Sequence, residues 1–445
     1  MYAIIAAAVT ILTGCLLLAP PAEAQVNWKQ SSGKELRILN LEQPYSQGLA
    51  KLFPEFEKET GIKVSQETMA QLAVIQKIGV ELAGGTGAYD LVFAEGSSLP
   101  QYIKGGWIQP IDEYMQNPKL TDPKSLDAND IIKSTLDAMK VEGKQYGLPF
   151  FAATVMMYYR KDVFEKYGIK KAPDNYDELV EILKKVHTKD MPGIALRGQP
   201  GAVMNIWHWS MFLYGYGGKF FKDYPKDMHP VFDSPGAIKA TDVYAQIMQN
   251  YSIPGAASAT FDDVVTAMQQ GNVAIALEGA PLGGRILDPE KSKVIGKLGF
   301  GLVPGGPAGR FPPFTAQGFA IASASKNKEA AYLFLQWATS KDTLLKVALN
   351  SRHVAVTRNK VWEDTEFLKK YNFDFGAGSY IKAFQETLKV APFWYRPAIP
   401  EFNKVGDRLG IAVQEAIVKR KSAAEAMKDA NADIDRMMKE AGYYK

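Results

Sequence analysis

The sequence predicts an α/β fold with parallel sheets in two lobes, and two observations support this prediction. Near the start of the chain, short apolar runs alternate with stretches whose apolar residues recur about every 3.6 positions, as strands and helices alternate in parallel sheets. The expected strands and helices alternate over residues 36–41, 49–58, 62–66, 69–82 and 90–93. The chain also has 445 residues, which is more than one hydrophobic core usually serves.

The rest of the chain continues this mixed pattern and ends in helices. Further strands are expected at 154–159, 193–196 and 273–277, and further helices after Asp177, at 204–214 and at 262–269. From residue 399 onward the pattern is helical. Its apolar residues recur every four positions, at Val405, Leu409, Val413 and Ile417. This spacing predicts an apolar stripe that docks a late helix on one lobe.

The first 24 residues predict an export signal peptide. There is no charged residue from Met1 to Ala22, and an apolar core at 4–18 precedes an Ala-x-Ala site at Ala22 and Ala24. This pattern predicts cleavage before Gln25 and delivery to the periplasm. A basic segment before the apolar core is missing, which is compatible with a true start codon further upstream.

Two alternatives to a cleaved signal peptide remain open. Residues 12–15, Leu-Thr-Gly-Cys, match a lipobox, which would make Cys15 a lipid-bearing N-terminus. The apolar run is also close to the roughly 20 residues that a membrane anchor needs. Cys15 is the only cysteine, so a mature chain without the leader would have no disulfide, thiolate metal site or cysteine nucleophile.

Charge and motifs argue against several classes of protein. The 52 basic and 48 acidic residues give a net charge of +4, and the one dense basic cluster is 419–421. Nucleic-acid binding, which needs a concentrated basic face, is therefore not expected. The four histidines form no zinc-binding helix motif, no Gly-x-Ser-x-Gly sequence occurs, and the glycines at 84–87 lack a following Lys-Ser/Thr. We expect no catalytic residues, no metal and no cofactor.

Five stretches carry a resemblance to a known family. They are 53–64; 89–93 with 106–111; 147–150 with 157–164; 268–277; and 318–322 with 326–331 and 396–400. Each stretch is degenerate alone, but their order and spacing together are specific. The chain resembles the family 1 extracellular solute-binding proteins, the carbohydrate receptors of bacterial ABC importers, over essentially the whole mature sequence.

This resemblance implies a two-lobed, type II periplasmic-binding-protein-like fold whose lobes close on a ligand in a cleft between them. Passages between lobes are expected at 147–149, at 302–307 and between 340 and 352. Lobe 1 would comprise 25–148 and 301–345, and lobe 2 would comprise 149–300 and 346–445. The protein would act as a monomer that captures a sugar, polyol or short oligosaccharide and delivers it to the permease subunits in the inner membrane.

Candidate ligand contacts on lobe 1 follow two of the predicted strands. Sugar sites combine flat apolar faces with forked donors and acceptors, and open α/β sheets place ligands at strand ends. Gln43 and Tyr45 follow the first strand, and Glu95 follows the strand at 90–93. The resemblance implies that both loops face the cleft. Asp90, which precedes the second of these strands, is expected to be structural.

On lobe 2 the densest aromatic feature is the helix at 204–214. The family's stacking position falls on or beside Trp207, with Asn205 nearby. Because Trp207 and Trp209 are two positions apart, they point to different sides of a helix and are not both expected to face the ligand. Both could instead belong to the core, and His208 is expected to be a surface imidazole.

Charged, amide and aromatic residues complete the set of candidate ligand contacts. Arg197 ends a predicted strand, where its guanidinium would fork onto vicinal hydroxyls or a carboxylate, or form a salt bridge between lobes. Glu278 follows another strand at a position where many relatives have tryptophan, which argues for a small or polar ligand. The remaining candidates are Gln317, Arg352, Trp394 and Arg396.

Two other functions remain open. One is a receptor for an anionic solute such as a sugar or polyol phosphate, in which Arg197, Arg352 and Arg396 would converge. The other is a secreted carbohydrate-active hydrolase, which would need a pair of carboxylates in the cleft.

Overall fold

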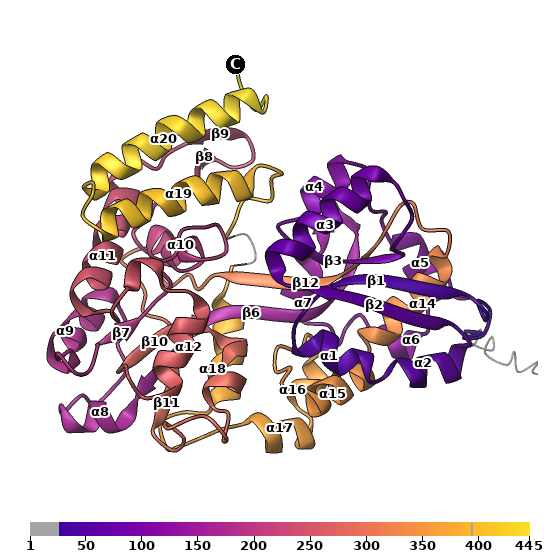
Figure 1. Cartoon of the computed structure of the whole chain (residues 1–445), viewed down its shortest axis with the longest axis horizontal. Helices are drawn as coiled ribbons and strands as arrows, with labels where there is room; N and C mark the ends of the chain where they lie inside the picture. Colours follow the sequence, from indigo (N-terminus) through magenta and orange to yellow (C-terminus); the bar gives the residue numbers. More distant parts are fainter. Residues whose placement is uncertain (1–25, 393–394) are drawn as a thin grey trace, which may run out of the picture.

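The computed structural model describes residues 26–392 and 395–445. The predicted signal peptide, Cys15 and Trp394 lie outside these residues. Figure 1 shows two lobes side by side, one containing the N-terminal strands and the other containing the C-terminal helices. The α/β prediction is confirmed, because strands and helices alternate through both lobes.

Lobe 1 is built on three parallel strands. They are β1 (Glu35–Leu41), β2 (Lys63–Met69) and β3 (Leu91–Glu95), in the order β2-β1-β3. The first helix expected, at 49–58, is in fact two helices, α1 (Pro44–Ala50) and α2 (Phe53–Thr60). Pro54 explains the break, because its ring nitrogen cannot donate the hydrogen bond that would continue α1.

Two long strands continue the sheet from lobe 1 into lobe 2. β12 (Phe314–Ile321) pairs antiparallel with β3 and with β6 (Gly147–Arg160). β6 then pairs with β10 (Ile275–Gly279) and β11 (Leu298–Gly301), and β10 pairs with β7 (Ile194–Ala195). Figure 1 shows β6 and β12 lying together where the lobes meet.

The remaining elements surround this sheet. In and beside lobe 1 they are α3 (Gln71–Gly84), α4 (Leu99–Lys104), α5 (Asp112–Gln116), α6 (Pro123–Leu126), α7 (Lys133–Asp137), β4 (Lys140–Val141), β5 (Lys144–Gln145), α14 (Lys328–Ala338), α15 (Lys341–Asn350), α16 (Asn359–Trp362) and α17 (Thr365–Tyr371). In lobe 2 they are α8 (Lys161–Lys166), α9 (Tyr176–Val186), α10 (Asn205–Gly215), β8 (Phe221–Asp223), β9 (Asp227–Pro230), α11 (Pro235–Tyr251), η1 (Ala256–Ser258), α12 (Phe261–Gln269), η2 (Ala280–Leu282), α13 (Gly283–Ile286), α18 (Tyr380–Val390), α19 (Phe402–Ile417) and α20 (Ala423–Glu440).

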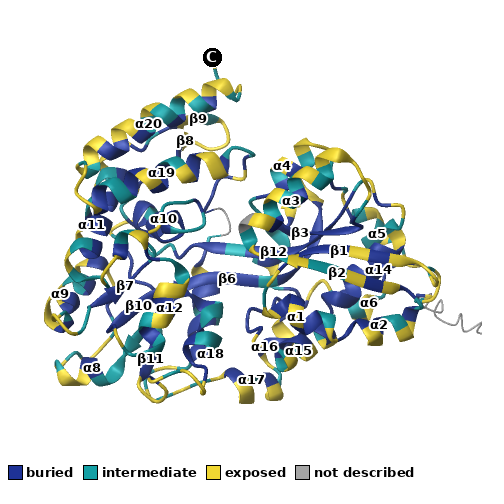
Figure 2. Cartoon of the chain, in the orientation of Figure 1, coloured by how far each residue is buried: buried dark blue, intermediate teal, exposed yellow. Residues whose placement is uncertain are grey.

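The burial of the late helices follows their sequence patterns. Every member of the predicted stripe on α19, Val405, Leu409, Val413 and Ile417, is buried, and the helix packs against α10, α11 and α20. α10 is buried around almost its whole circumference, as expected of an apolar helix in the centre of a lobe. Figure 2 shows the buried residues concentrated on the sheet and on such inner helix faces.

The contacts of the late helices favour a last passage between lobes that comes later than the expected range 340–352. α15 packs against α1, and α17 packs against α15, whereas α18 packs against β6 and β11. Helices that share a buried apolar face belong to one folding unit. We therefore propose that the chain leaves lobe 1 between α17 and α18, so that residues 346–371 belong with lobe 1.

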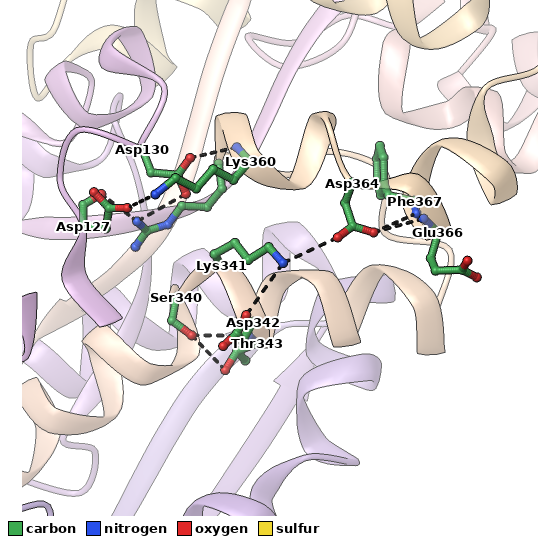
Figure 3. A network of polar contacts seen from close by, with 11 residues as sticks. Asp127, Asp130, Ser340, Lys341, Asp342, Thr343, Lys360, Asp364, Glu366 and Phe367 are labelled. Carbon is green, nitrogen blue, oxygen red and sulfur yellow. Dashed lines mark hydrogen bonds and ion pairs between the residues drawn. The ribbon is translucent and has the colours of Figure 1, made fainter. Parts of the chain in front are cut away.

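A buried arginine anchors the segment that lies beside β6 in lobe 1. Arg358 is fully buried and donates hydrogen bonds to the carbonyl oxygens of Thr339, Asp127 and Ser125 at 2.8, 2.8 and 3.2 Å. The carboxylate of Asp130 lies 3.8 Å from its Nη1. Figure 3 shows the surrounding network, in which Lys360 reaches both Asp127 and Asp130.

Candidate functional site

A buried polar cluster lies where residues of the two lobes meet. We define the Arg396 cluster as Glu95, Trp207, Gln317, Tyr395 and Arg396. Arg396 and Tyr395 belong to the segment between α18 and α19, whereas Glu95 is the last residue of β3. Nη2 of Arg396 lies 3.7 Å from Oε1 of Glu95, and each side chain is only 6% exposed. This ion pair therefore connects the two lobes out of contact with bulk water.

Aromatic rings surround the guanidinium of Arg396. Its carbon lies 5.8 Å from the ring centre of Trp207, 4.9 Å from that of Tyr395 and 5.4 Å from that of Phe402. The rings of Trp207 and Tyr395 meet edge to face, with centres 5.2 Å apart. Such contacts stabilise a cation that has lost its hydration. The cluster thus combines apolar ring surfaces with charged groups.

Gln317 belongs to the cluster because it lies next to Glu95 in the sheet. In the register of β12 it lies opposite Glu95 of β3 on one side and Phe151 of β6 on the other. Its side chain is buried. The end of β3 and the middle of β12 therefore present a carboxylate and an amide at neighbouring positions of the sheet.

Several buried polar atoms of this cluster have no hydrogen-bond partner among the described residues. They are Nε1 of Trp207, Oε1 of Gln317, the hydroxyl of Tyr395 and Nη1 of Arg396. Burial raises the pKa of the Tyr395 hydroxyl well above its usual range, so this group remains a potential donor. A buried polar group without a partner costs about 1–3 kcal/mol, and such groups are uncommon in folded proteins. The four atoms are suited to hydrogen bonds with a ligand.

A second ion pair lies beside this cluster. Nε of Arg197 donates to Oε2 of Glu278 at 2.9 Å, and its Nη2 donates to Oε1. Burial favours protonation of Glu278, but Arg197, His208 and hydrogen bonds outweigh it, so the pKa of this carboxyl is lowered and it stays charged. His208, which follows Trp207 on α10, hydrogen-bonds the carbonyl oxygen of Leu277, the neighbour of Glu278, so Glu278 lies close to the helix that carries Trp207.

His208 is part of the interior, although the sequence suggested a surface imidazole. The side chain is fully buried, and its Nε2 hydrogen-bonds the carbonyl oxygen of Leu277 at 2.8 Å. Burial lowers its pKa to about 4, so the ring is neutral at neutral pH. The polar side chain is tolerated there because α10 turns it toward β10, whose end carries Glu278.

Other predicted contacts make structural interactions. Tyr45 stacks face to face on Phe150, with ring centres 3.8 Å apart, and its hydroxyl donates to the carbonyl of Ala338 at 3.0 Å. Asn205 donates to the carbonyl of Gly410 at 2.8 Å and so joins α10 to α19. Asp90 accepts from the backbone N–H of Arg37 and from the hydroxyl of Ser325, consistent with a structural role.

The last two candidates, Gln43 and Arg352, are not members of the Arg396 cluster. Nε2 of Gln43 is buried without a partner in the described part of the chain, and its backbone N–H bonds the Ser46 hydroxyl. Arg352 pairs with the buried Asp288 and is itself about half exposed. No described contact joins Arg352 to the Arg396 cluster.

Two residues with suitable chemistry were not singled out from the sequence. Tyr395 lies between Trp394 and Arg396, so its place in an aromatic block before a proline was the available signal. Thr154 of β6 has a buried hydroxyl without a partner among the residues described. Its signal was weak, because one threonine in an apolar strand is ordinary.

Within the described residues there is no group of three histidine, cysteine or acidic side chains that would hold a metal ion. No helix among them is long and apolar enough to cross a membrane. Two surface hollows, of about 240 and 550 Å³, are lined by other residues, the first by Thr86 and Trp107 and the second by His187 and Gln249. The Arg396 cluster is therefore the candidate ligand site because several of its buried polar groups have no partner among the described residues.

Comparison with known proteins decides the family. The model of the bacterial extracellular solute-binding proteins matches residues 41–343. The chain belongs to this family. It is 27% identical to the mannitol-binding protein of Pseudomonas aeruginosa, over 90% of this chain and 91% of that protein. It is 24% identical to the erythritol/L-threitol-binding protein of Mycolicibacterium smegmatis, over 87% and 83% of the two chains.

Solved structures of ABC-transporter solute-binding proteins have the same fold. A protein of Agrobacterium radiobacter in complex with ribitol superposes with a TM-score of 0.80 at 26% identity, over 91% of this chain and 99% of that one. A protein of Agrobacterium vitis with bound D-mannitol gives a TM-score of 0.79 at 28% identity, over 93% and 100%. The two-lobed fold and the family expected from the sequence are both confirmed.

Proposed function

We propose that this protein is the substrate-binding protein of an ABC importer that captures a sugar, polyol or short oligosaccharide by closure of its lobes. Small polyols are the favoured ligands within this class. The relatives described above are named for mannitol, erythritol and threitol, and the two solved structures contain ribitol and mannitol. The permease subunits of the importer would receive the ligand from the closed protein, which would act as a monomer.

The observation that carries this proposal is the set of buried unpaired groups in the Arg396 cluster. Trp207, Tyr395 and Arg396 offer N–H and O–H donors, and Gln317 offers a carbonyl oxygen. A hydroxyl both donates and accepts, so a ligand with several hydroxyls satisfies such a mixed set. The rings of Trp207 and Tyr395 supply apolar surface for the C–H groups of the same ligand.

The position of the cluster supports a mechanism of capture. Glu95 comes from β3 in lobe 1, whereas Trp207 comes from α10 in lobe 2. A ligand that bonds both sides of the junction stabilises the closed state relative to an open one, and only this difference in affinity shifts the equilibrium. Arg352, which no described contact joins to the cluster, would then act indirectly.

The two alternative functions receive less support. Arg197 and Arg396 each face a carboxylate, Glu278 and Glu95 respectively, so an anionic solute would find no unpaired cation there. A hydrolase would need one protonated carboxyl as a general acid. Arg197 opposes the protonation of Glu278, whose pKa is lowered. We infer that the protein binds its ligand without chemistry, and its family is described as bacterial extracellular solute-binding proteins.

The experiment that tests this proposal is calorimetric titration of residues 25–445 with alditols of four to six carbons, hexoses and maltose, beside a glycoside turnover assay. Micromolar or tighter binding of a hydroxyl-rich solute without turnover is the expected result. Turnover of a glycoside, or binding of none of these compounds, would contradict the proposal.

Export is tested separately. The intact mass of the protein recovered from the periplasm distinguishes an N-terminus at Gln25, which we propose, from a lipidated Cys15. A mass that includes residues 1–24 would contradict both forms of processing.

A further inference from the structure

Arg197 has the geometry of a carboxylate-binding residue, but its binding positions are occupied from within the chain. Nε and Nη2, the two N–H groups that form a parallel fork, both donate to Glu278. Nη1 donates to the carbonyl of Val203 at 2.9 Å. Bidentate pairing of this kind is how arginine recognises a carboxylate or phosphate ligand. In this protein the carboxylate of Glu278 occupies the position that the carboxylate or phosphate of a ligand would occupy.

Burial makes this internal pair costly to separate. The Glu278 side chain is fully buried, and that of Arg197 is only 12% exposed. The carboxylate also accepts a hydrogen bond from the backbone N–H of Gly279 at 2.5 Å. Separating such a pair would leave a charge in a site of low polarity, which is costly. A ligand therefore has to bind beside the pair and not in place of Glu278.

The pair borders the candidate ligand site. Nη1 of Arg197 donates to the carbonyl of Val203, just before α10, and Trp207 of α10 contacts both Tyr395 and Arg396. The other cation of the site, Arg396, faces Glu95. Two arginines and two glutamates thus sum to no net charge, and the groups left unpaired in the Arg396 cluster suit hydroxyls.

We propose that Glu278 is a specificity-determining residue that acts as a built-in counter-ion and makes the site reject acidic analogues of its ligand. The proposal rests on the proposed function, because it assumes a hydroxyl-rich ligand between the lobes. A sugar acid or sugar phosphate would bring its charge close to two carboxylates while Arg197 is already occupied. Glu278→Gln keeps the shape of the side chain but removes its charge and one of its two acceptors, so part of the guanidinium fork becomes available to the ligand.

The test compares neutral compounds with acids of the same carbon skeleton. The pairs are D-mannitol with D-mannonate, ribitol with D-ribonate, and D-glucose with D-glucuronate, titrated at low ionic strength into the wild-type protein and Glu278→Gln. The buffer contains no chloride, because a small anion would occupy a freed guanidinium. Glu181→Gln is the matched control, since it makes the same change of charge at an exposed position of lobe 2.

The wild-type protein should bind the neutral member of a pair at least about tenfold more tightly than the acid. Glu278→Gln should shift that ratio toward the acid by at least about tenfold, as expected for a gained charge-assisted hydrogen bond. Glu181→Gln should leave the ratio within about twofold, because its charge is screened by solvent.

The outcomes separate this inference from the proposed function. If the wild-type protein binds a neutral compound but Glu278→Gln gains nothing for the acid, the role of Glu278 is wrong and the proposed function stands. Equal or tighter binding of the acid by the wild-type protein overturns the inference even if Glu278→Gln does not fold. If no neutral or acidic compound binds the wild-type protein, the proposed function fails and this inference fails with it.

Discussion

Two buried arginines show how differently one chain can use a charge that has been removed from water. Arg358, beside β6 in lobe 1, gives hydrogen bonds from Nε, Nη1 and Nη2 to three carbonyl oxygens and lies near Asp130. Arg396, at the junction of the lobes, faces Glu95 at 3.7 Å. Its Nη1 has no hydrogen-bond partner within the described ranges.

The difference teaches how to distinguish an anchor from a site. The hydrogen bonds of Arg358 go to fixed backbone atoms, so its contacts hold the loops around α6 and α16 together and leave little for a ligand. Arg396 is held by rings and by one distant carboxylate, so it keeps hydrogen-bonding capacity inside the protein. The two arginines are buried to a similar degree. They differ in how many of their N–H groups have hydrogen-bond partners.

The largest effect is expected from removing the anchor. Arg358→Met should lower the free energy of unfolding by about 3–5 kcal/mol, because Asp130 would remain buried without its cation. Urea unfolding followed by circular dichroism measures this change. Arg420→Met, at an exposed position after α19, is the control and should change stability by less than about 0.5 kcal/mol. If Arg358→Met lowers the free energy of unfolding by less than about 1 kcal/mol, Arg358 is not a structural anchor.

Removing the second arginine should weaken ligand binding, and it should also lower stability, because Glu95 would lose its buried cation. Arg396→Met should weaken affinity for the best ligand by about 10- to 150-fold, since a hydrogen bond to a charged group contributes about 1.5–3 kcal/mol. Calorimetric titration measures it, and Arg285→Met, a partly exposed arginine of lobe 2 paired with Asp262, is the control. Unchanged affinity together with a large loss of stability would make Arg396 a second anchor.

A pH dependence sharpens the comparison, because each region contains a buried histidine. Burial lowers the pKa of His353, beside β6, to about 4, and that of His208, beside Glu278, to about 4. Both rings stay neutral in the folded protein, whereas the unfolded chain binds protons below about pH 6.5. Stability is therefore fully present above that pH and is lost as the pH falls toward 4.

Between about pH 7 and about pH 5.8, each histidine should contribute about 1 kcal/mol of this loss. Urea unfolding of His353→Gln and His208→Gln at the two pH values measures the contributions separately. Each variant should show a shallower pH dependence than the wild-type protein. The same slope in all three proteins would show that other groups govern the acid sensitivity.

The smallest effect is expected at the aromatic face of the site. Trp207→Leu should weaken ligand binding by about 0.5–1.5 kcal/mol, through the loss of ring contact and of its N–H donor. Trp209→Phe provides the contrast, because Trp209 is fully buried and donates to Thr241 at 2.9 Å. That variant should lower stability and leave affinity unchanged. The reverse assignment, with Trp209→Phe weakening binding at unchanged stability, would move the site to the other side of α10.

Much of the fold could be predicted from local patterns, and the misses have local causes. The boundaries of β1, β2 and β3 lie within about three residues of their expected positions, because alternating apolar segments depend little on distant contacts. The helix expected at 49–58 is two helices, since Pro54 outweighs the apolar periodicity. The position of the last passage between lobes stays a prediction, because a helix carries no local signal of the lobe on which it packs.

The site was harder to predict than the fold. Glu95 is predicted from a strand end, Trp207 from the family resemblance and Arg396 from an aromatic block, and the structure brings these three together although they are far apart in the sequence. Tyr45 satisfied the same criteria but stacks on Phe150 in the core. Arg197 and Glu278 were treated as separate contacts, whereas they bind each other. Position at a strand end does not reveal what a side chain will meet.

By itself the sequence determined the class of fold, the alternation of elements, and the residue types available for a hydroxyl-rich ligand. These depend on periodicity, proline and glycine, and composition, all of which act over a few residues. Only the tertiary structure decided which arginine is saturated, which keeps a free N–H, and which carboxylate neutralises which cation. Those choices depend on hydrogen-bond geometry between segments that are remote in the chain, and that geometry exists only after the sheet has brought them together.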